Sequence, residues 1–305
     1  MGNTKTLKSI RPKRRLRIKK RPSEVVVDVI IYIILVLLAV LTIVPFMRVI
    51  TISMAPPHVA TSFGLHLWPR EISWDGYLAV LNHRLIWTAY GNTIFRVITG
   101  TSLSMFLLVI GAYPLSKSYL PNRKLWTLII LFTMWFSGGM IPMYILVMRV
   151  LGIGNSIFAL ILPGAVSAFN LIVARNFFET IPESLEESAR LDGAGDFRIL
   201  FQIVVPLSKP VLATVGLWII VGHWNAWFDS MIYMRDESRF VLQHVLRNIL
   251  LEGQTIDPNQ LVGVHVNTET MRMATIVVST VPILLVYPFL QKYFVQGVMI
   301  GAVKG

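Results

Sequence analysis

Long apolar stretches separated by short polar segments run through most of this chain. Each has the roughly 20 residues that an α-helix needs to cross the hydrocarbon core of a bilayer. The stretches cover residues 25–52, 86–115, 125–147, 156–173, 210–233 and 272–293. Because only helices and closed barrels satisfy the backbone hydrogen bonds inside lipid, the pattern predicts an all-α membrane protein with about six transmembrane helices. Gly138, Gly139 and Pro142 predict a kink within the third of them.

Positive charge is concentrated before the first stretch, where ten Lys and Arg residues precede Glu24, the first acid. A basic block beside an apolar run is held on the cytoplasmic side, where it meets anionic lipid. We therefore expect a basic cytoplasmic leader at residues 1–24, a six-helix transmembrane domain at 25–295 and a flexible cytoplasmic tail at 296–305. Both termini are then cytoplasmic. Three arginines in a loop assigned to the outside oppose this topology: Arg235, Arg239 and Arg247.

The composition agrees with a membrane protein and limits its chemistry. Hydrophobic residues make up 54% of the chain and charged residues 14%, with a mean hydropathy of +0.64. An ordinary soluble domain carries about 25% charged residues. The chain has no cysteine, which excludes disulfides and thiol chemistry. The net charge of +12 lies mainly in the leader without a base-reading module, so membrane lipid is the expected partner and nucleic acid is not.

A polar segment at residues 182–210 separates the fourth and fifth stretches within a cytoplasmic loop at 175–209. Its first part has the features of a short helix. Pro182 suits the first turn, the acids after it favour the positive end of the helix dipole, and Gly193 with Gly195 ends the helix. Ile181, Leu185 and Ala189 share one face, opposite Glu183, Glu187 and Arg190. The pattern predicts an amphipathic helix along the membrane, with its acidic face toward the cytoplasm. A simpler interpretation is a surface helix whose Ser184 and Glu187 form a capping box.

The spacing within this segment resembles the EAA loop of bacterial ATP-binding-cassette importer permeases. Glu187, Ser188 and Ala189 are followed by Gly193 and by Ile203, Val205 and Pro206, with Ser188 and Val205 as conservative departures. In that family the loop forms a coupling helix that docks on the ATPase subunit. The resemblance implies ATPase-coupling roles for Glu183, Glu186, Glu187, Ser188, Ala189, Asp192, Gly193, Ala194 and Pro206.

Other runs resemble the carbohydrate-uptake permeases, in particular the smaller maltose-type subunit and the subgroup that serves complex oligosaccharides or polysaccharide fragments. They are residues 136–146, 170–178 and 222–234 and the C-terminal GVMIGAVKG. The resemblance implies the type I importer permease fold in a bacterial cytoplasmic membrane. It also implies three kinds of protein partner: a second, different permease, a pair of ATPase subunits that bind ATP and Mg, and an extracytoplasmic sugar-binding protein, with no cofactor in this chain. A permease for a non-sugar solute is the alternative.

Polar and aromatic residues inside the second and fifth stretches are candidates for the substrate pathway. Polar groups at membrane depth are costly unless they face a cavity or another helix, and aromatic faces stack on sugars. The candidates are Asn92, Arg96, His223, Trp224, Asn225 and Trp227. The alternative for all of them is interhelical packing, with Arg96 bound to a backbone carbonyl or a neighbouring acid. Asp229 is expected near the outer end of the fifth span, in contact with water or the binding protein.

Rival functions have weaker support. Residues 193–196 spell the GxGD of intramembrane aspartyl proteases, but Asp196 lies in a polar loop without a second acid in a nearby span. The sequence has no H-E-x-x-H, G-x-S-x-G or P-loop motif, so no catalytic or metal-binding residue is expected and ATP hydrolysis must reside elsewhere. An ion-coupled secondary transporter would need acids at mid-membrane, and the spans hold almost none.

Overall fold

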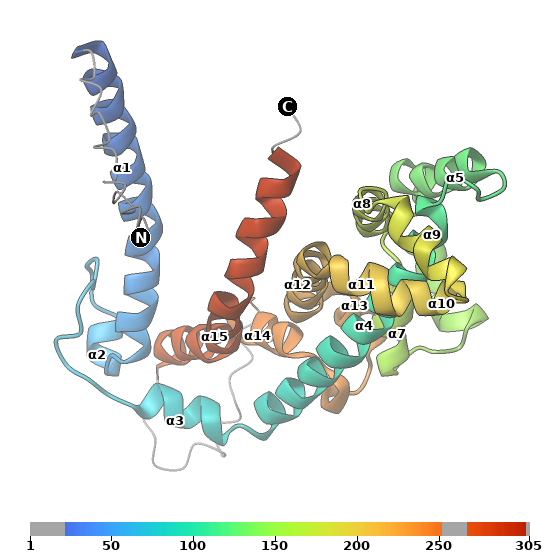
Figure 1. Ribbon diagram of the computed structural model, residues 1–305. Coiled ribbons are helices and arrows are strands. Elements are labelled where there is room, and N and C mark those ends of the chain that lie inside the picture. The colour runs from blue at the N-terminus through green and yellow to red at the C-terminus, as the bar shows by residue number, and fades with distance from the viewer. Residues whose placement is uncertain (1–21, 252–266, 303–305) are drawn as a thin grey trace, which may run out of the picture.

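The computed structural model describes residues 22–251 and 267–302, and these residues form helices joined by loops (Figure 1). Three helices are long and apolar enough to cross a membrane. They are α1 (Pro22–Ser53), α4 (Arg84–Ser116) and α15 (Thr268–Ala302). Three pairs of shorter helices, each bent at a break, also have the length and composition of a span. Counting each pair as one span, the described residues hold six candidate spans, as predicted.

The first bent pair confirms the predicted kink. Helix α5 (Arg123–Trp135) ends where Phe136 takes an extended conformation, and Gly139 follows with φ +88°. Helix α6 (Met140–Ile145) and the π-helical turn η1 (Leu146–Val150) then run at 105° to α5. A bend this large re-aims the chain, so the second half of the stretch does not continue the line of α5.

The other two bent pairs differ in detail from the predicted spans. In the fourth, α7 (Ile157–Ile161) and the 3₁₀ turn η2 (Leu162–Gly164) meet α8 (Ala168–Phe178) at 50°. In the fifth, residues 196–207 meet residues 209–225 at 83°, and the predicted end of this span at residue 233 is wrong. Helix α12 (Lys209–Asn225) stops at Ala226, which is extended, and a separate helix α13 (Phe228–Tyr233) follows. Residues of α13 and of the loop after it bind α4.

The predicted loops and tail contain more helix than expected. The loop between the first and second predicted spans carries α2 (Pro57–Ala60) and α3 (Asp75–Asn82). The loop between the fifth and sixth carries η4 (Glu237–Arg239) and α14 (Leu242–Leu251). Leu242, Val245 and Ile249 of α14 are buried in a core cluster that includes Ile86 of α4. Helix α15 continues through residues 296–302, where an irregular tail was expected. Residues 1–21 of the predicted leader and 303–305 of the tail lie outside the described residues.

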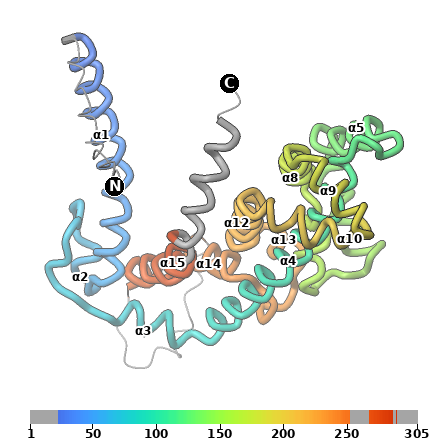
Figure 2. Tube along the Cα trace, in the orientation of Figure 1, coloured from blue at the N-terminus to red at the C-terminus, as the bar shows by residue number. Residues whose placement is uncertain are grey.

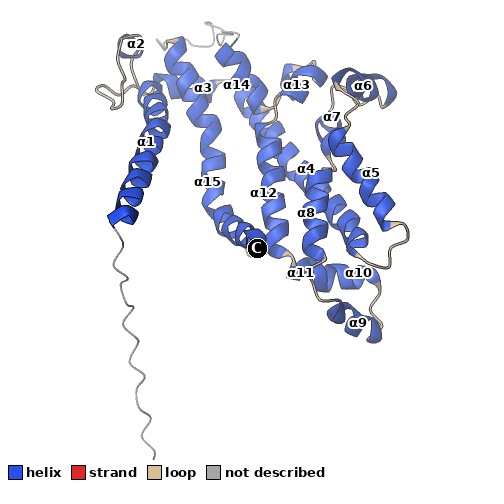
Figure 3. Ribbon diagram, turned by 90° about the horizontal axis from the view of Figure 1, so that it is seen from above, coloured by secondary structure: helices blue, strands red, loops and turns tan. Residues whose placement is uncertain are grey.

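The packed body of the molecule surrounds α4. Its largest core cluster joins α4 to α8 and α12 through buried side chains such as Leu108, Leu171 and Val215. Helix α1 meets this body near its end at Ser53, where Ile52 and Ala55 pack with Met273, and most of its other side chains are exposed. Figure 3 shows α9 and α10 at one end of the molecule and α2, α3, α13 and α14 at the other. We call these the α9 end and the α14 end.

Candidate functional site

The polar segment forms the helix and turn predicted for it. Helix α9 (Glu183–Leu191) is followed by α10 (Asp196–Ile199), the π-helical turn η3 (Leu200–Val204) and α11 (Val205–Leu207). Gly193 has φ +81°, a conformation that residues with a Cβ rarely adopt. The Ala194 amide donates to the Ala189 carbonyl at 2.9 Å and closes the helix end. Helix α9 is therefore a short helix with a closed C-terminal end that protrudes from the bundle (Figures 2 and 3).

Most of the predicted coupling residues are accessible on this segment. The exposed ones are Glu183, Glu187, Ser188, Asp192, Gly193 and Pro206, whereas Ala189 and Ala194 are half-buried against the core. Glu187 makes no side-chain hydrogen bond or ion pair within the described residues. The predicted apolar face is only partly correct, because Ile181 is buried but Leu185 is 45% exposed.

Glu186 was also predicted as a coupling residue, but it points into the protein and cannot contact a docked subunit directly. Only 5% of the residue is exposed, and one carboxylate oxygen pairs with Lys117 Nζ at the end of α4. Tyr113 Oη donates to the other oxygen at 3.3 Å, and Lys117 Nζ lies 4.7 Å from the centre of the Tyr113 ring. An acid this deeply buried is stable only when it is paired, and α4 supplies both partners. Here we call Tyr113, Lys117 and Glu186 the α4–α9 junction.

Exposed contacts surround this junction. Ser118 Oγ donates to Glu183 at 3.4 Å, and Arg190 donates to the Tyr119 hydroxyl at 2.8 Å and to Asp196 at 2.6 Å. Burial lowers the pKa of Arg190, but the nearby Tyr119, Asp196 and Tyr113 together raise it above its ordinary value. The residues that join α4 to α5 thus hold α9 along its length.

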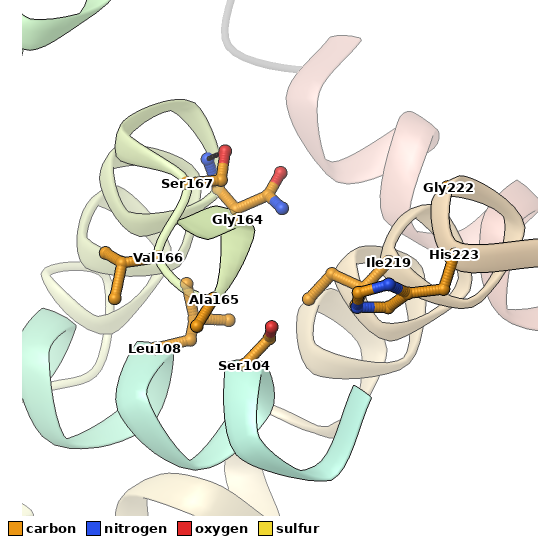
Figure 4. A pocket seen from close by; sticks show the side chains of 10 residues that line it. Ser104, Leu108, Gly164, Ala165, Val166, Ser167, Ile219, Gly222 and His223 are labelled. Carbon is orange, nitrogen blue, oxygen red and sulfur yellow. Dashed lines mark hydrogen bonds between the residues drawn. The ribbon is translucent and has the colours of Figure 1, made fainter. Parts of the chain in front are cut away.

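A cavity of about 210 Å³ lies between α4, η2, α8 and α12 (Figure 4). Its polar side chains come from Ser104, Ser167, Asn170 and His223. Of the six predicted pathway residues, only His223 lines it. The sequence did not single out Ser104, Ser167 or Asn170 as pathway residues. Two signals were available, because Ser104 belongs to a run of small residues on the second span and Asn170 opens the run at residues 170–178.

Asn92 and Arg96 hold protein segments together at the α14 end and do not line this cavity. Asn92 Nδ2 donates to the carbonyls of Ser238 and Phe240 at 2.8 and 3.0 Å. Arg96 pairs through two nitrogens with Asp229 and donates to the Leu160 carbonyl at 3.1 Å. The interhelical alternative for these two residues is therefore the correct one. Asp229 was expected to contact water or the binding protein, but its carboxylate pairs with Arg96, and 27% of its side chain is exposed.

The three remaining candidates lie around the end of α12. Trp224 is buried in the core and meets the ring of Tyr90 edge-on at 6.3 Å. Asn225 is exposed, and Trp227, beyond the end of α12, lies under the Arg247 guanidinium at 4.0 Å. These residues sit near the end of α12, whereas they were expected half way along a longer helix. None of the three lines the cavity described above.

His223 reaches the cavity because Gly100 leaves room for its ring. A Cβ atom added to Gly100 would lie 2.6 Å from His223 Nε2. Arg96, Gly100, Ser104 and Leu108 are spaced four residues apart and share one face of α4. Along this face the order from the α14 end is the Asp229 ion pair, the His223 contact and then the cavity. In the described residues, no three His, Asp or Glu side chains are grouped as metal ligands.

A family model described as binding-protein-dependent transport system inner membrane component matches residues 91–300. The chain is 41% identical over 281 residues to the polygalacturonan/rhamnogalacturonan transport system permease protein YtcP of Bacillus subtilis, covering 91% of this chain and 98% of that protein. It superposes with a TM-score of 0.86 and 36% identity on a chain of a bacterial ABC transporter involved in the import of the acidic polysaccharide alginate, covering 90% and 99% of the two chains. A chain from the alginate transporter complex with a periplasmic protein bound to an alginate pentasaccharide shares the fold at TM-score 0.59 and 14% identity, covering 88% and 94% of the chains.

Proposed function

We propose that this chain forms half of the translocation pathway of an importer for acidic oligosaccharides. The chain belongs to the family of binding-protein-dependent transport system inner membrane components. ATP is hydrolysed on separate subunits, and this chain is a multi-pass permease of the inner membrane. The observation that carries the substrate class is the similarity along nearly the whole chain to two permeases of acidic-polysaccharide systems, one pectic and one for alginate. The substrate is then a fragment of a uronate-containing polysaccharide.

Helix α9 is the surface that meets the ATPase pair in this proposal. Glu187 offers an exposed carboxylate to a basic side chain of the ATPase, with Glu183, Ser188 and Asp192 around it. Gly193 gives the positive φ at which the chain leaves the helix, and Pro206 begins the return toward α12. The α9 end is accordingly cytoplasmic, and the α14 end faces the extracytoplasmic sugar-binding protein.

The cavity supplies the sugar-contacting wall. Hydroxyl, amide and imidazole groups exchange hydrogen bonds with sugar hydroxyls. Ser104 Oγ is buried with no hydrogen-bond partner in the described part of the chain, which leaves it available to a ligand. The cavity volume of about 210 Å³ is below the roughly 300–1,000 Å³ of complete ligand pockets. A second, different permease therefore closes the other side of the pathway.

The pathway claim is tested by filling the cavity from a position that tolerates a side chain. A Cβ at Gly222 meets nothing within 4 Å, and Gly222 lines the cavity. Gly222→Leu should lower uptake of a labelled oligogalacturonide at least about tenfold, which corresponds to a rise of about 1.4 kcal/mol in the transport barrier. Gly91→Leu is the matched control, because Gly91 is an exposed α4 glycine that also has open space around its Cβ position. Normal uptake by Gly222→Leu would remove the cavity from the pathway.

The docking and substrate claims need separate measurements. Glu187→Arg should abolish both uptake and co-purification of the ATPase, while membrane insertion stays normal, because it reverses a charge at the docking surface. Normal uptake with normal co-purification would exclude docking through Glu187. For the substrate, calorimetry of the cognate binding protein should detect oligogalacturonides or oligoalginates in preference to neutral maltodextrins. Exclusive binding of an amino acid or another non-sugar solute would overturn the carbohydrate assignment.

A further inference from the structure

We propose that the α4–α9 junction is the mechanical link of this permease, through which Lys117 and Tyr113 make α4 move together with α9. The proposal rests on the function proposed above, in which α9 docks on the ATPase. In it Glu186 and Lys117 are positioning residues that connect ATP hydrolysis to the cavity without contacting either the nucleotide or the sugar. The ATPase contact itself belongs to exposed residues of α9.

Burial of the junction argues against an accidental surface contact. The Lys117 and Glu186 side chains are each only 6% exposed, and the segments that carry them are 69 residues apart. Taking two charges out of water costs several kcal/mol per ion before their attraction is counted. Glu183 and Glu187, on the same helix, keep their carboxylates at the surface. The chain thus buries one of three neighbouring acids of α9 and provides it with a cation from another helix.

The geometry of the junction restricts sliding and rotation of α9. Lys117 binds one carboxylate oxygen of Glu186, and Tyr113 donates to the other at 3.3 Å. Tyr113 lies in the last turn of α4 and Lys117 directly follows the helix, so both reach Glu186 from the same end of α4. Tyr113 lies within α4, directly before Pro114, so its hydrogen bond to Glu186 connects α9 to the part of α4 that precedes this proline. A displacement of α9 along or around its own axis has to break at least one of these bonds or carry α4 with it.

The path through α4 leads directly to the cavity. The cavity residues Ser104 and Leu108 lie on α4, and the helix from Ser104 to its last residue, Ser116, is about 18 Å long at 1.5 Å per residue. The covalent path from α9 instead passes through a π-helical turn and an 83° bend before α12 begins. The junction is therefore the straighter route from the docking helix to the sugar-contacting wall. Its loss should uncouple motion of α9 from the cavity while α9 remains docked.

The first experiment measures transport and ATPase activity together in proteoliposomes that hold the full transporter with its binding protein. Lys117→Met and Glu186→Gln should retain at least about half of the ATPase activity stimulated by binding protein. Transport should fall at least about tenfold, so that fewer sugars move per ATP. The exchanged pair Lys117→Glu with Glu186→Lys should restore most of that ratio. Ser118→Ala, which removes only a long exposed hydrogen bond, is the control and should keep the wild-type ratio.

A second experiment does not depend on removal of the ion pair. The chain has no cysteine, so Lys117→Cys with Glu186→Cys introduces the only two thiols of this subunit. A bifunctional maleimide about as long as the two replaced side chains then fixes α9 to α4. Cross-linked transporter should keep transporting, because the two helices move as one body. Each single cysteine variant treated with the same reagent is the control.

Two results would overturn the proposal. One is a parallel loss of ATPase activity and transport in Lys117→Met and Glu186→Gln, or no loss in either, since a purely structural ion pair leaves their ratio unchanged. The other is loss of transport on cross-linking, because it would mean that α9 moves relative to α4 in the transport cycle. Failure of the proposed function itself looks different. The wild-type transporter would then show no ATPase activity stimulated by binding protein.

Discussion

Helix α4 carries a buried ion pair at each end of the molecule, and the two pairs are built differently. At the α14 end, Arg96 is 3% exposed and binds Asp229 and the Leu160 carbonyl, which ties α4 to α13 and α7 at once. At the α9 end, the Lys117 ammonium and the Tyr113 hydroxyl bind a single carboxylate on α9. The first arrangement joins three segments of the packed body, whereas the second joins that body to one protruding helix.

The two ion pairs differ in the number of segments that they join and in the cation that joins them, and both differences predict different roles. An arginine presents several donors in a planar fork, so Arg96 fixes both the distance and the orientation of its neighbours. Lysine is a single charge on a flexible stem, which allows small tilts while it resists separation. We therefore expect the Arg96 pair to determine the stability of the α14 end, and the Lys117 pair to determine how motion passes to α4. Three variants sharpen or break this contrast.

The largest effect on stability is expected from Asp229→Asn. The change leaves the Arg96 guanidinium buried without a charged partner, a situation that costs about 3–5 kcal/mol in soluble proteins. Thermal unfolding of the purified transporter should therefore begin at a clearly lower temperature than for the wild-type transporter. Asp229→Asn with wild-type unfolding but a reduced ratio of sugar to ATP would assign the coupling role to the wrong end of α4.

An intermediate effect is expected from Gly100→Ala, on the face of α4 between the two ion pairs. The new methyl group would lie 2.6 Å from His223 Nε2 and 2.8 Å from its Cε1, so the ring has to move out of its site. Overpacking of this kind costs about 1–3 kcal/mol. Uptake should fall because the displaced imidazole enters the cavity, and Gly91→Ala, with open space around its Cβ position, should behave as wild type. Equal uptake by the two variants would show that His223 has no fixed place in the pathway.

The sequence was sufficient to predict the spans and the kink in the third of them, but not where α12 ends. A membrane helix needs a long apolar run, and all six runs are visible as such. Helix α12 ends at Asn225, and four residues later Asp229 meets Arg96, a contact between segments 133 residues apart that no local pattern contains. The same limit explains why Asn92 and Arg96 were assigned to the pathway. A polar residue inside a span indicates that a partner exists, but it does not say whether that partner is a ligand or another helix.

The coupling loop shows this limit at the scale of one residue. Glu186 and Glu187 are chemically identical neighbours, and helical periodicity grouped Ile181, Leu185 and Ala189 as the buried face. In the structure Leu185 is exposed and Glu186 is buried, because Lys117 and Tyr113 bind the Glu186 carboxylate. The motif spacing identified the helix correctly. The division of its acids between the surface and an internal ion pair required the distant segment.

The smallest effect is expected from Arg190→Ala, which tests whether burial makes the α4–α9 junction special. Arg190 also links α9 to its surroundings, through Tyr119 and Asp196, but the paired Arg190 and Asp196 side chains are 42% and 61% exposed. Exposed ion pairs contribute about 0–1 kcal/mol because water and salt screen them. Arg190→Ala should therefore shift thermal unfolding only slightly and leave the ratio of sugar transported to ATP hydrolysed unchanged, as measured in the same proteoliposomes. If Arg190→Ala lowered that ratio as much as Lys117→Met, any contact along α9 would serve to transmit motion, and the buried carboxylate would lose its particular role.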